Sequence, residues 1–292
     1  MPSLKDLRQR IAAVKSTKKI TSAMKMVSAS KLRRAQESVL AARPYAERMG
    51  RIMSNLTASL SPEARETLLL TGNGRADHHL ILPITANRGL CGAFNSAVVR
   101  ETREFIADLM ASGKNVVLLC IGHKGYLLLR KYYGEKTISQ VEEITTPITF
   151  DVAEAIGRRV VRLFEAGTFD VCTIIFNRFQ SAMSQVVTKQ QIIPVLVEQV
   201  TASESEARAL YEYEPSEEAV LETLAPMNIT VQIFRALLES VASEHGARMT
   251  AMDNATRSAT DMMNDLTLTY NRTRQAYITK ELIEIISGAE AL

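Results

Sequence analysis

The segment with the most potential for chemistry is Arg88-Gly89-Leu90-Cys91-Gly92, a glycine-containing loop between an apolar run and an amphipathic one. When such a loop leads from a strand into a helix, the amide groups at the start of the helix can bind phosphate. The loop matches neither the Gly-x-x-x-x-Gly-Lys-Ser/Thr pattern of a P-loop nor the three-glycine dinucleotide fingerprint. We therefore interpret the glycines as a tight turn that lets a helix approach a sheet. A phosphate-binding α/β enzyme is kept as an alternative.

The other reactive residue types form no recognisable catalytic or metal-binding set. Cys91 needs a base to act as a nucleophile, and the sequence places no His or Asp beside it for that role. Cys91, Cys120 and Cys172 are widely spaced in apolar or glycine-rich settings, which indicates a reducing compartment without disulfides or a zinc site. The remaining candidates are His78, His79, His123 and His245 and the pairs Glu142-Glu143 and Glu217-Glu218. We expect no catalytic residue, no metal and no cofactor.

Strand-like and helix-like segments alternate in the middle of the chain. We expect strands at 80–85, 115–121, 136–144, 170–176 and 186–195, and helices at 95–110, 124–133 and 151–165. This alternation is typical of a Rossmann-like, mostly parallel α/β sheet with right-handed crossovers. No helix separates the last two strands, so that edge of the sheet is predicted to be antiparallel.

Long helical patterns at the two chain ends predict an antiparallel coiled coil, with the α/β domain inserted between its helices. In the first helix, alternating steps of three and four residues give Leu4, Leu7, Ile11, Val14, Lys18, Thr21, Lys25 and Ser28. Across the polar positions the apolar stripe is expected to shift to Ile20, Met24 and Val27. In the second helix the seam includes Val231, Leu238, Met252, Ala255, Ala259, Met262 and Leu266.

Five segments follow from these patterns. They are an N-terminal shaft helix at 1–60, a linker at 61–78, a central α/β domain at 79–200, an acidic segment at 201–225 and a C-terminal shaft helix at 226–292. Pro226 lies where the helical pattern has already begun, so we expect a kink or a fresh start there.

Charge is distributed unevenly along the chain. Residues 1–51 contain thirteen Lys and Arg against three acidic residues, a net charge of +10, so the rest carries −7 of the overall +3. The basic segment is compatible with a mitochondrial targeting segment, a nucleic-acid grip or a surface for an acidic protein. The helical pattern is too long and unbroken for the first, and no aromatic residue precedes Tyr45 for base stacking in the second. We favour the acidic protein, and no apolar run is long enough to predict a membrane span.

Four motifs resemble the gamma subunit of the F-type ATP synthase. Residues 18–32, KKITSAMKMVSASKL, resemble the family's N-terminal helix, and residues 88–92 resemble its central-domain loop. Residues 244–255, EHGARMTAMDNA, and 268–282, LTYNRTRQAYITKEL, resemble its C-terminal helix. The motifs occur in the family's order and cover the chain from end to end.

The resemblance implies a non-catalytic rotor whose helices turn inside a ring of alpha and beta subunits. Its foot would lie on the membrane c ring beside the epsilon (or delta) subunit. Expected contacts with beta are Lys18, Met24, Lys25, Arg274 and Gln275; those with the c ring and epsilon are Tyr211 and Glu214. The helix end is too hydrophobic all round for a free tip, which implies a bearing of partner side chains; its apolar residues are Ile278, Leu282, Ile283, Ile285 and Ile286.

The expected location is the bacterial inner membrane, peripheral and on the cytoplasmic side, because the chain starts at Met1 without a transit peptide. No nucleic-acid partner is expected. A coiled-coil adaptor that binds an acidic partner is the alternative function.

Overall fold

The computed structural model describes residues 3–59, 68–141, 147–195 and 217–290. The chain forms two compact units, one from residues 1–29 with 248–292 and the other from residues 30–247. Two long helices, α1 (Leu4–Ser59) and α6 (Glu217–Glu290), contribute residues to both units. The predicted long terminal helices are therefore present.

The second unit is built on a five-stranded sheet in the order β3-β2-β1-β4-β5. Strands β1, β2, β3 and β4 are parallel, whereas β5 pairs with β4 in the antiparallel direction, as predicted. The strand bounds are His78–Pro83, Asn115–Ile121, Thr137–Val141, Val171–Phe179 and Gln185–Ile193. The Rossmann-like prediction for the centre of the chain is thus confirmed.

Three helices connect the parallel strands: α3 (Phe94–Ala111), α4 (His123–Tyr133) and α5 (Phe150–Glu165). A 3₁₀ turn, Gly134–Lys136, follows α4, and a short helix, α2 (Leu68–Thr71), lies in the segment predicted to be only a linker. Leu69 and Leu70 of α2 are buried in the core, and this burial gives the short helix tertiary support.

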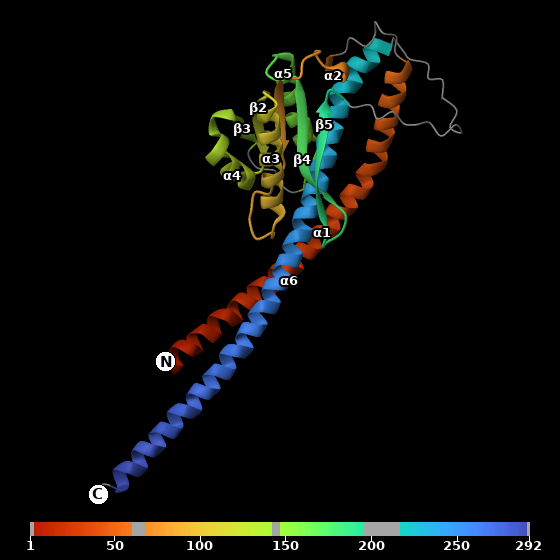
Figure 1. Ribbon diagram of the computed structural model, residues 1–292. Helices are drawn as coiled ribbons and strands as arrows, with labels where there is room; N and C mark the ends of the chain where they lie inside the picture. Colours follow the sequence, from red (N-terminus) through yellow and green to blue (C-terminus); the bar gives the residue numbers. More distant parts are fainter. Residues whose placement is uncertain (1–2, 60–67, 142–146, 196–216, 291–292) are drawn as a thin grey trace. The chain divides into compact units, whose positions relative to one another are not determined.

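Each face of the sheet has its own apolar core. On one face Ile81, Leu118 and Ile175 pack with Val98 and Ile106 of α3 and Leu129 of α4. The larger core on the other face combines sheet residues with α5, α6, α2 and Met49 and Met53 of α1. Figure 1 shows α3 and α4 to one side of β4 and β5 and α6 to the other. The α6 residues used here include Ile229, Ile233 and Leu237, which lie off the predicted coiled-coil seam.

The first unit is an antiparallel pair of helical segments from α1 and α6. Thr21 Oγ1 accepts a hydrogen bond from Thr256 Oγ1 at 2.8 Å, and Arg8 Nη2 donates to the Tyr270 hydroxyl at 3.0 Å. Because the partner's number rises as the α1 number falls, the two segments run in opposite directions. This confirms the predicted antiparallel coiled coil.

Two details of the predicted seam are wrong. The stripe does not shift to Ile20 and Val27, which are 58% and 56% exposed, while Thr21 and Ser28 are buried. In α6, Met262 is 54% exposed and Met263 is the half-buried neighbour instead. Small hydroxyl residues let the two helices approach and bond to each other, so the polar positions remain at the contact.

Both long helices continue through a proline, Pro44 in α1 and Pro226 in α6. The expectation that the helix has begun before Pro226 is confirmed, because α6 starts at Glu217. A fresh start at Pro226 is wrong: α6 is one helix. Its burial against the sheet, through Leu221, Ala225 and Ile229, supports the turn from which proline removes a backbone hydrogen bond.

Candidate functional site

Hydrogen bonds join the segment that precedes the glycine loop, residues 85–87, to the start of α4. Thr85 Oγ1 accepts from the backbone N–H of Gly125 at 2.9 Å, and Asn87 Oδ1 accepts from that of His123 at 3.2 Å. The N–H of Lys124 donates to the Ala86 carbonyl at 3.1 Å. These amides belong to the start of α4, which follows β2. In α3, the helix that the loop leads into and whose amides a phosphate would need, the N–H of Phe94 donates to the Cys91 carbonyl at 3.2 Å.

Two glycines at the start of α4 lie so close to Thr85 that no side chain would fit at either position. A Cβ on Gly122 would lie 2.0 Å from the Thr85 carbonyl oxygen, and Gly122 has a φ of +94°. A Cβ on Gly125 would lie 2.5 Å from Thr85 Oγ1. These contacts show a close approach of α4 to the segment after β1. In the loop itself, Gly92 has a φ of +56°, which suits a turn, while a Cβ on Gly89 would meet only Lys124 Cε at 3.9 Å.

Cys91 is a packing residue in this arrangement. It is 2% exposed and clusters with Ala86, Phe94 and Ala247 of α6. Its Sγ accepts a hydrogen bond from Asn95 Nδ2 at 3.2 Å, and Asn95 Oδ1 accepts from the Ala86 amide. A buried thiol in apolar surroundings is a poor nucleophile. Cys91 and Phe94 thus pack in the segment after β1, at the strand ends where a doubly wound sheet commonly binds its ligand.

The histidines and carboxylates give no metal site within the described residues. Asp170, which is 4% exposed, accepts the backbone N–H of His78 at 2.9 Å and that of Asp77 at 3.0 Å. Desolvation raises the pKa of Asp170, but the bonds from Asn73 and these amides outweigh it and leave the pKa lowered. Burial lowers the pKa of His79. His78 is exposed, while His79 is half-buried.

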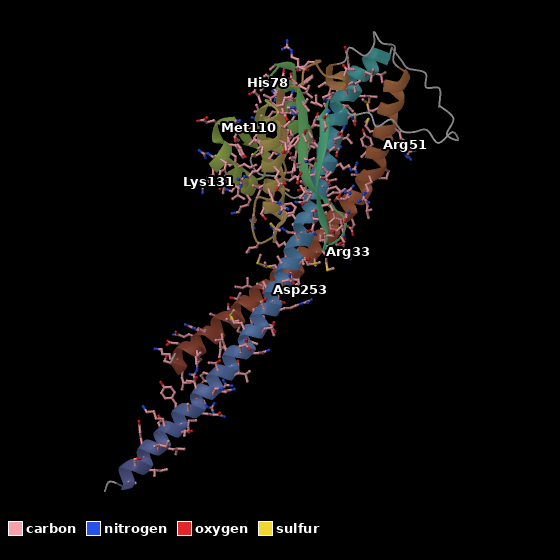
Figure 2. The ribbon with its side chains drawn as sticks, in the orientation of Figure 1. Arg33, Arg51, His78, Met110, Lys131 and Asp253 are labelled. Atoms are coloured by element: carbon pink, nitrogen blue, oxygen red, sulfur yellow. The ribbon has the colours of Figure 1, made fainter. Side chains whose placement is uncertain are left out.

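The three predicted contact residues on α1, which are Lys18, Met24 and Lys25, are all partly covered within the helix pair. Lys25 Nζ donates to Asp253 Oδ1 at 2.6 Å, and Arg257 Nη2 lies 2.7 Å from the other oxygen of Asp253. The Lys25 hydrogen bond is the largest cause of the lowered pKa of Asp253. Figure 2 marks Asp253 on α6. Lys18 and Met24 are half-buried.

The end of α6 extends past the start of α1, as Figure 1 shows. Arg8 is the α1 residue bonded to Tyr270. From Arg274 to Ser287 every residue is exposed, including Arg274 and Gln275. In the described parts of the chain neither side chain makes a hydrogen bond or an ion pair, so both are available to another molecule.

The predicted bearing residues at this end are exposed and share one face. Ile278, Leu282, Ile285 and Ile286 are 45%, 53%, 68% and 58% exposed. At 100° per residue they fall within an arc of about 100°. Lys280 and Glu284 lie on the opposite side and form an ion pair of 3.4 Å. Ile283, which is 58% exposed, lies about 60° outside this arc and widens the apolar surface to about 160°. The tip thus presents a broad apolar surface that suits a partner.

The predicted foot contacts, Tyr211 and Glu214, lie outside the described residues.

Sequence reasoning missed the charged cluster around Glu239, which is 1% exposed. Glu239 stands beside the seam position Leu238, and its position alone indicates a solvated helix residue. The sequence did contain a signal for this cluster: each of the two long helices has a basic residue there, Arg43 in α1 and Arg235 in α6.

In the part of the chain that the structure describes, no helix combines the length and apolar character needed to cross a membrane.

Comparisons with known proteins agree over the whole length. A family model described as ATP synthase matches residues 3–292. The chain is 56% identical over 299 residues to the ATP synthase gamma chain of Rhodospirillum rubrum and 57% identical over 293 residues to that of Chelativorans sp. (strain BNC1). Both alignments cover 100% of each chain.

Solved structures give the same relationship. A chain from the central stalk and c-ring structure of the Tetrahymena thermophila mitochondrial ATP synthase has a TM-score of 0.62 at 28% identity, over 81% of this chain and 99% of that chain. One from the Euglena gracilis mitochondrial enzyme (OSCP/F1/c-ring, rotational state 3) has a TM-score of 0.70 over 99% and 94%, and at 21% identity it shows the fold alone. With a helix pair, a Rossmann-like unit and full-length relatives of one kind, the chain belongs to the gamma-subunit family of the F-type ATP synthase.

Proposed function

We propose that this chain is the central rotor stalk of a proton-translocating ATP synthase. It turns with the c ring of the membrane sector and drives the catalytic beta subunits through their binding states for ATP synthesis. It performs no catalysis itself. Membership of the gamma-subunit family supports this role. So does the segment after β1, which binds the α4 amides of His123 and Gly125 and buries the Cys91 thiol.

The observation that carries the proposal is the change along α6 from a paired to a partner-free helix. Up to Tyr270 the helix is bonded to α1, and beyond it the exposed side chains include an apolar face. A helix that binds inside a ring of other subunits needs such a face, because it must exchange water for partner side chains. The alpha and beta subunits are the proposed partners of this end.

Individual contacts follow from the exposed groups. Arg274 and Gln275 offer hydrogen-bond donors to beta, and Lys18 and Met24 lie on the α1 side of the pair. Lys25 is a weaker candidate than expected, since its ammonium group already bonds Asp253. The epsilon (or delta) subunit and the c ring are the proposed partners of Tyr211 and Glu214. The whole assembly would be peripheral on the cytoplasmic side of a bacterial inner membrane.

A rotation assay tests the role directly. Lys131 lies on α4 and is exposed (Figure 2), while all three native cysteines are buried. A Lys131→Cys variant assembled with alpha and beta subunits can therefore carry a single optical probe, with the complex fixed through beta. The proposal predicts ATP-driven stepwise rotation of the probe about the axis of the alpha–beta ring. ATP hydrolysis at a normal rate with a stationary probe would refute it.

A further inference from the structure

A hollow of about 290 Å³ lies in the unit formed by residues 30–247, where three elements meet. Its lining consists of Arg43 and Ala46 from α1, Arg178 and Phe179 from β4, and Arg235 and Glu239 from α6. Three of these six residues are arginines and one is an acid. All three arginines are exposed, and together they concentrate guanidinium groups around one concave site.

Glu239 anchors the hollow and is fully engaged by the protein. Its side chain is 2% exposed, and its Oε1 lies 3.5 Å from Nη2 of Arg43. Its Oε2 accepts the backbone N–H of Phe179 at 2.9 Å. A buried carboxylate is costly unless it is paired and hydrogen-bonded. Arg43 and the β4 amide meet that need, and in return Glu239 holds Arg43 at the wall of the hollow.

The other two arginines have no such partner. Among the described residues, neither Arg178 nor Arg235 makes an ion pair or a side-chain hydrogen bond. Arginine stays protonated at every relevant pH, so with one acid against three cations the hollow carries two uncompensated positive charges. Charges of the same sign repel more strongly beside protein than in bulk water. An anion in the hollow would remove that cost and would bond to both free guanidinium groups.

We propose that this hollow is a binding site for a phosphate group, held by Arg178 and Arg235 with Arg43 at its edge. The planar donor fork of arginine matches the oxygens of phosphate in a two-point arrangement. A phosphate dianion also matches the excess of two positive charges. The inference depends only on the residues of the hollow and is independent of the proposed rotor function, so either can fail without the other.

Titration calorimetry with the purified full-length chain and inorganic phosphate tests the site, against potassium chloride at equal ionic strength. We expect saturable binding of phosphate and none of chloride. Arg178→Ala with Arg235→Ala should weaken it about tenfold or more, since two charge-assisted bonds are lost. The control Arg100→Ala with Arg158→Ala removes the same charge from exposed sites and should change the affinity less than about twofold.

Two further variants separate a site from a general charge effect. Arg178→Lys with Arg235→Lys keeps the charge but not the fork, so its affinity should fall between those of the wild type and the alanine variant. Glu239→Gln removes the one negative charge and should strengthen phosphate binding. Thermal unfolding with and without phosphate gives a second readout of each variant.

Titration with ADP identifies the source of the phosphate. If ADP binds more tightly than inorganic phosphate and the alanine variant loses this binding, the site holds a nucleotide phosphate. If ADP binds more weakly than inorganic phosphate and the alanine variant loses both, the site holds free phosphate. Absence of saturable phosphate binding to the wild type, or equal binding by the alanine variant and the wild type, would overturn the proposal.

Discussion

Lys25 and Asp253 join α1 to α6 through an ion pair of 2.6 Å, with side-chain exposures of 44% and 24%. The interval from Arg8 to Lys25 equals the interval from Asp253 to Tyr270, and both pairs are bonded across the helices. Matching intervals of this kind fix one antiparallel register. A polar or charged contact within a coiled-coil seam commonly specifies register at some expense in stability.

A charge exchange tests this role of the pair. Lys25→Glu places two carboxylates together and should lower the midpoint of thermal unfolding, whereas Lys25→Glu with Asp253→Lys should recover most of the loss. Lys18→Glu, on the same helix without an acidic partner in the described residues, should change the free energy of unfolding by no more than about 0.5 kcal/mol. If the double exchange is as unstable as Lys25→Glu alone, the two side chains do not act as a pair.

The same pair predicts a dependence of stability on pH. The hydrogen bond from Lys25, with the charges of Arg257 and Lys25, lowers the pKa of Asp253. A carboxyl whose pKa is lowered by folding stabilises the protein at pH values above its pKa in the unfolded chain, about 3.9. That contribution is lost as the pH falls through the pKa of the folded state. The stability difference between the wild type and Asp253→Asn should therefore be constant near neutrality and shrink below about pH 4. Thermal unfolding of both proteins across this range measures it; a constant difference down to the lowest pH would contradict the assignment.

Gly122 is predicted to be intolerant of any side chain. Gly122→Ala combines an unfavourable φ with a contact of 2.0 Å to the Thr85 carbonyl oxygen, and should cost roughly 2–4 kcal/mol of unfolding free energy. Gly113→Ala is the matched control: its φ is +74°, but nothing lies within 4 Å of the added carbon. Its cost should stay near about 1 kcal/mol. Equal losses in urea unfolding would show that the close approach of α4 to β1 is not the cause.

The three thiols should be protected in the native chain. Burial raises the pKa of Cys120 to about 12 and that of Cys172 well above its ordinary value, and Cys91 is buried. The thiolate is the reactive form, so a thiol reagent near pH 8 should label the native chain only slowly. In denaturant all three cysteines should react at the rate of free cysteine. Rapid labelling of any native thiol would show that its core opens locally.

Arg274 and Gln275 should matter to the complex and not to the chain. Both are exposed, so Arg274→Ala with Gln275→Ala should leave the unfolding free energy of the isolated chain within about 0.5 kcal/mol. A charged hydrogen bond to a partner contributes about 1.5–3 kcal/mol, so the assembled enzyme should lose turnover. Asn271→Ala with Arg272→Ala, exposed on the same helix, serves as the control. Turnover equal to that of the control would show that these two residues do not engage beta.

Sequence patterns predicted the central unit well because its strands are apolar runs bounded by glycine and polar residues. The bounds of β2 agree with the prediction at both ends, and those of α5 differ by one residue. The short helix α2 was missed because its four residues carry no periodicity. Its position depends on burial against a distant part of the chain.

The helix pair was harder to predict in detail, since apolar periodicity describes only part of what holds it. Ile20 and Val27 looked like seam residues, but hydroxyl groups at Thr21 and Thr256 bond directly across the contact. Lys25 was predicted as a contact with beta, but its ammonium group bonds Asp253 across the helix pair. The partner that changes its role, Asp253, lies more than two hundred residues away, and one sequence does not reveal such a pairing.

The sheet core also constrains how the protein is made. Its larger apolar face is covered by α6 residues such as Ile229 and Leu237, together with Met49 and Met53 from the opposite end of the chain. During synthesis from the N-terminus, the five strands leave the ribosome before α6 does. Until Leu237 has emerged, the nascent chain exposes that face to solvent, a state that favours aggregation or chaperone binding. Completion of this domain is therefore delayed until most of the polypeptide has been synthesised.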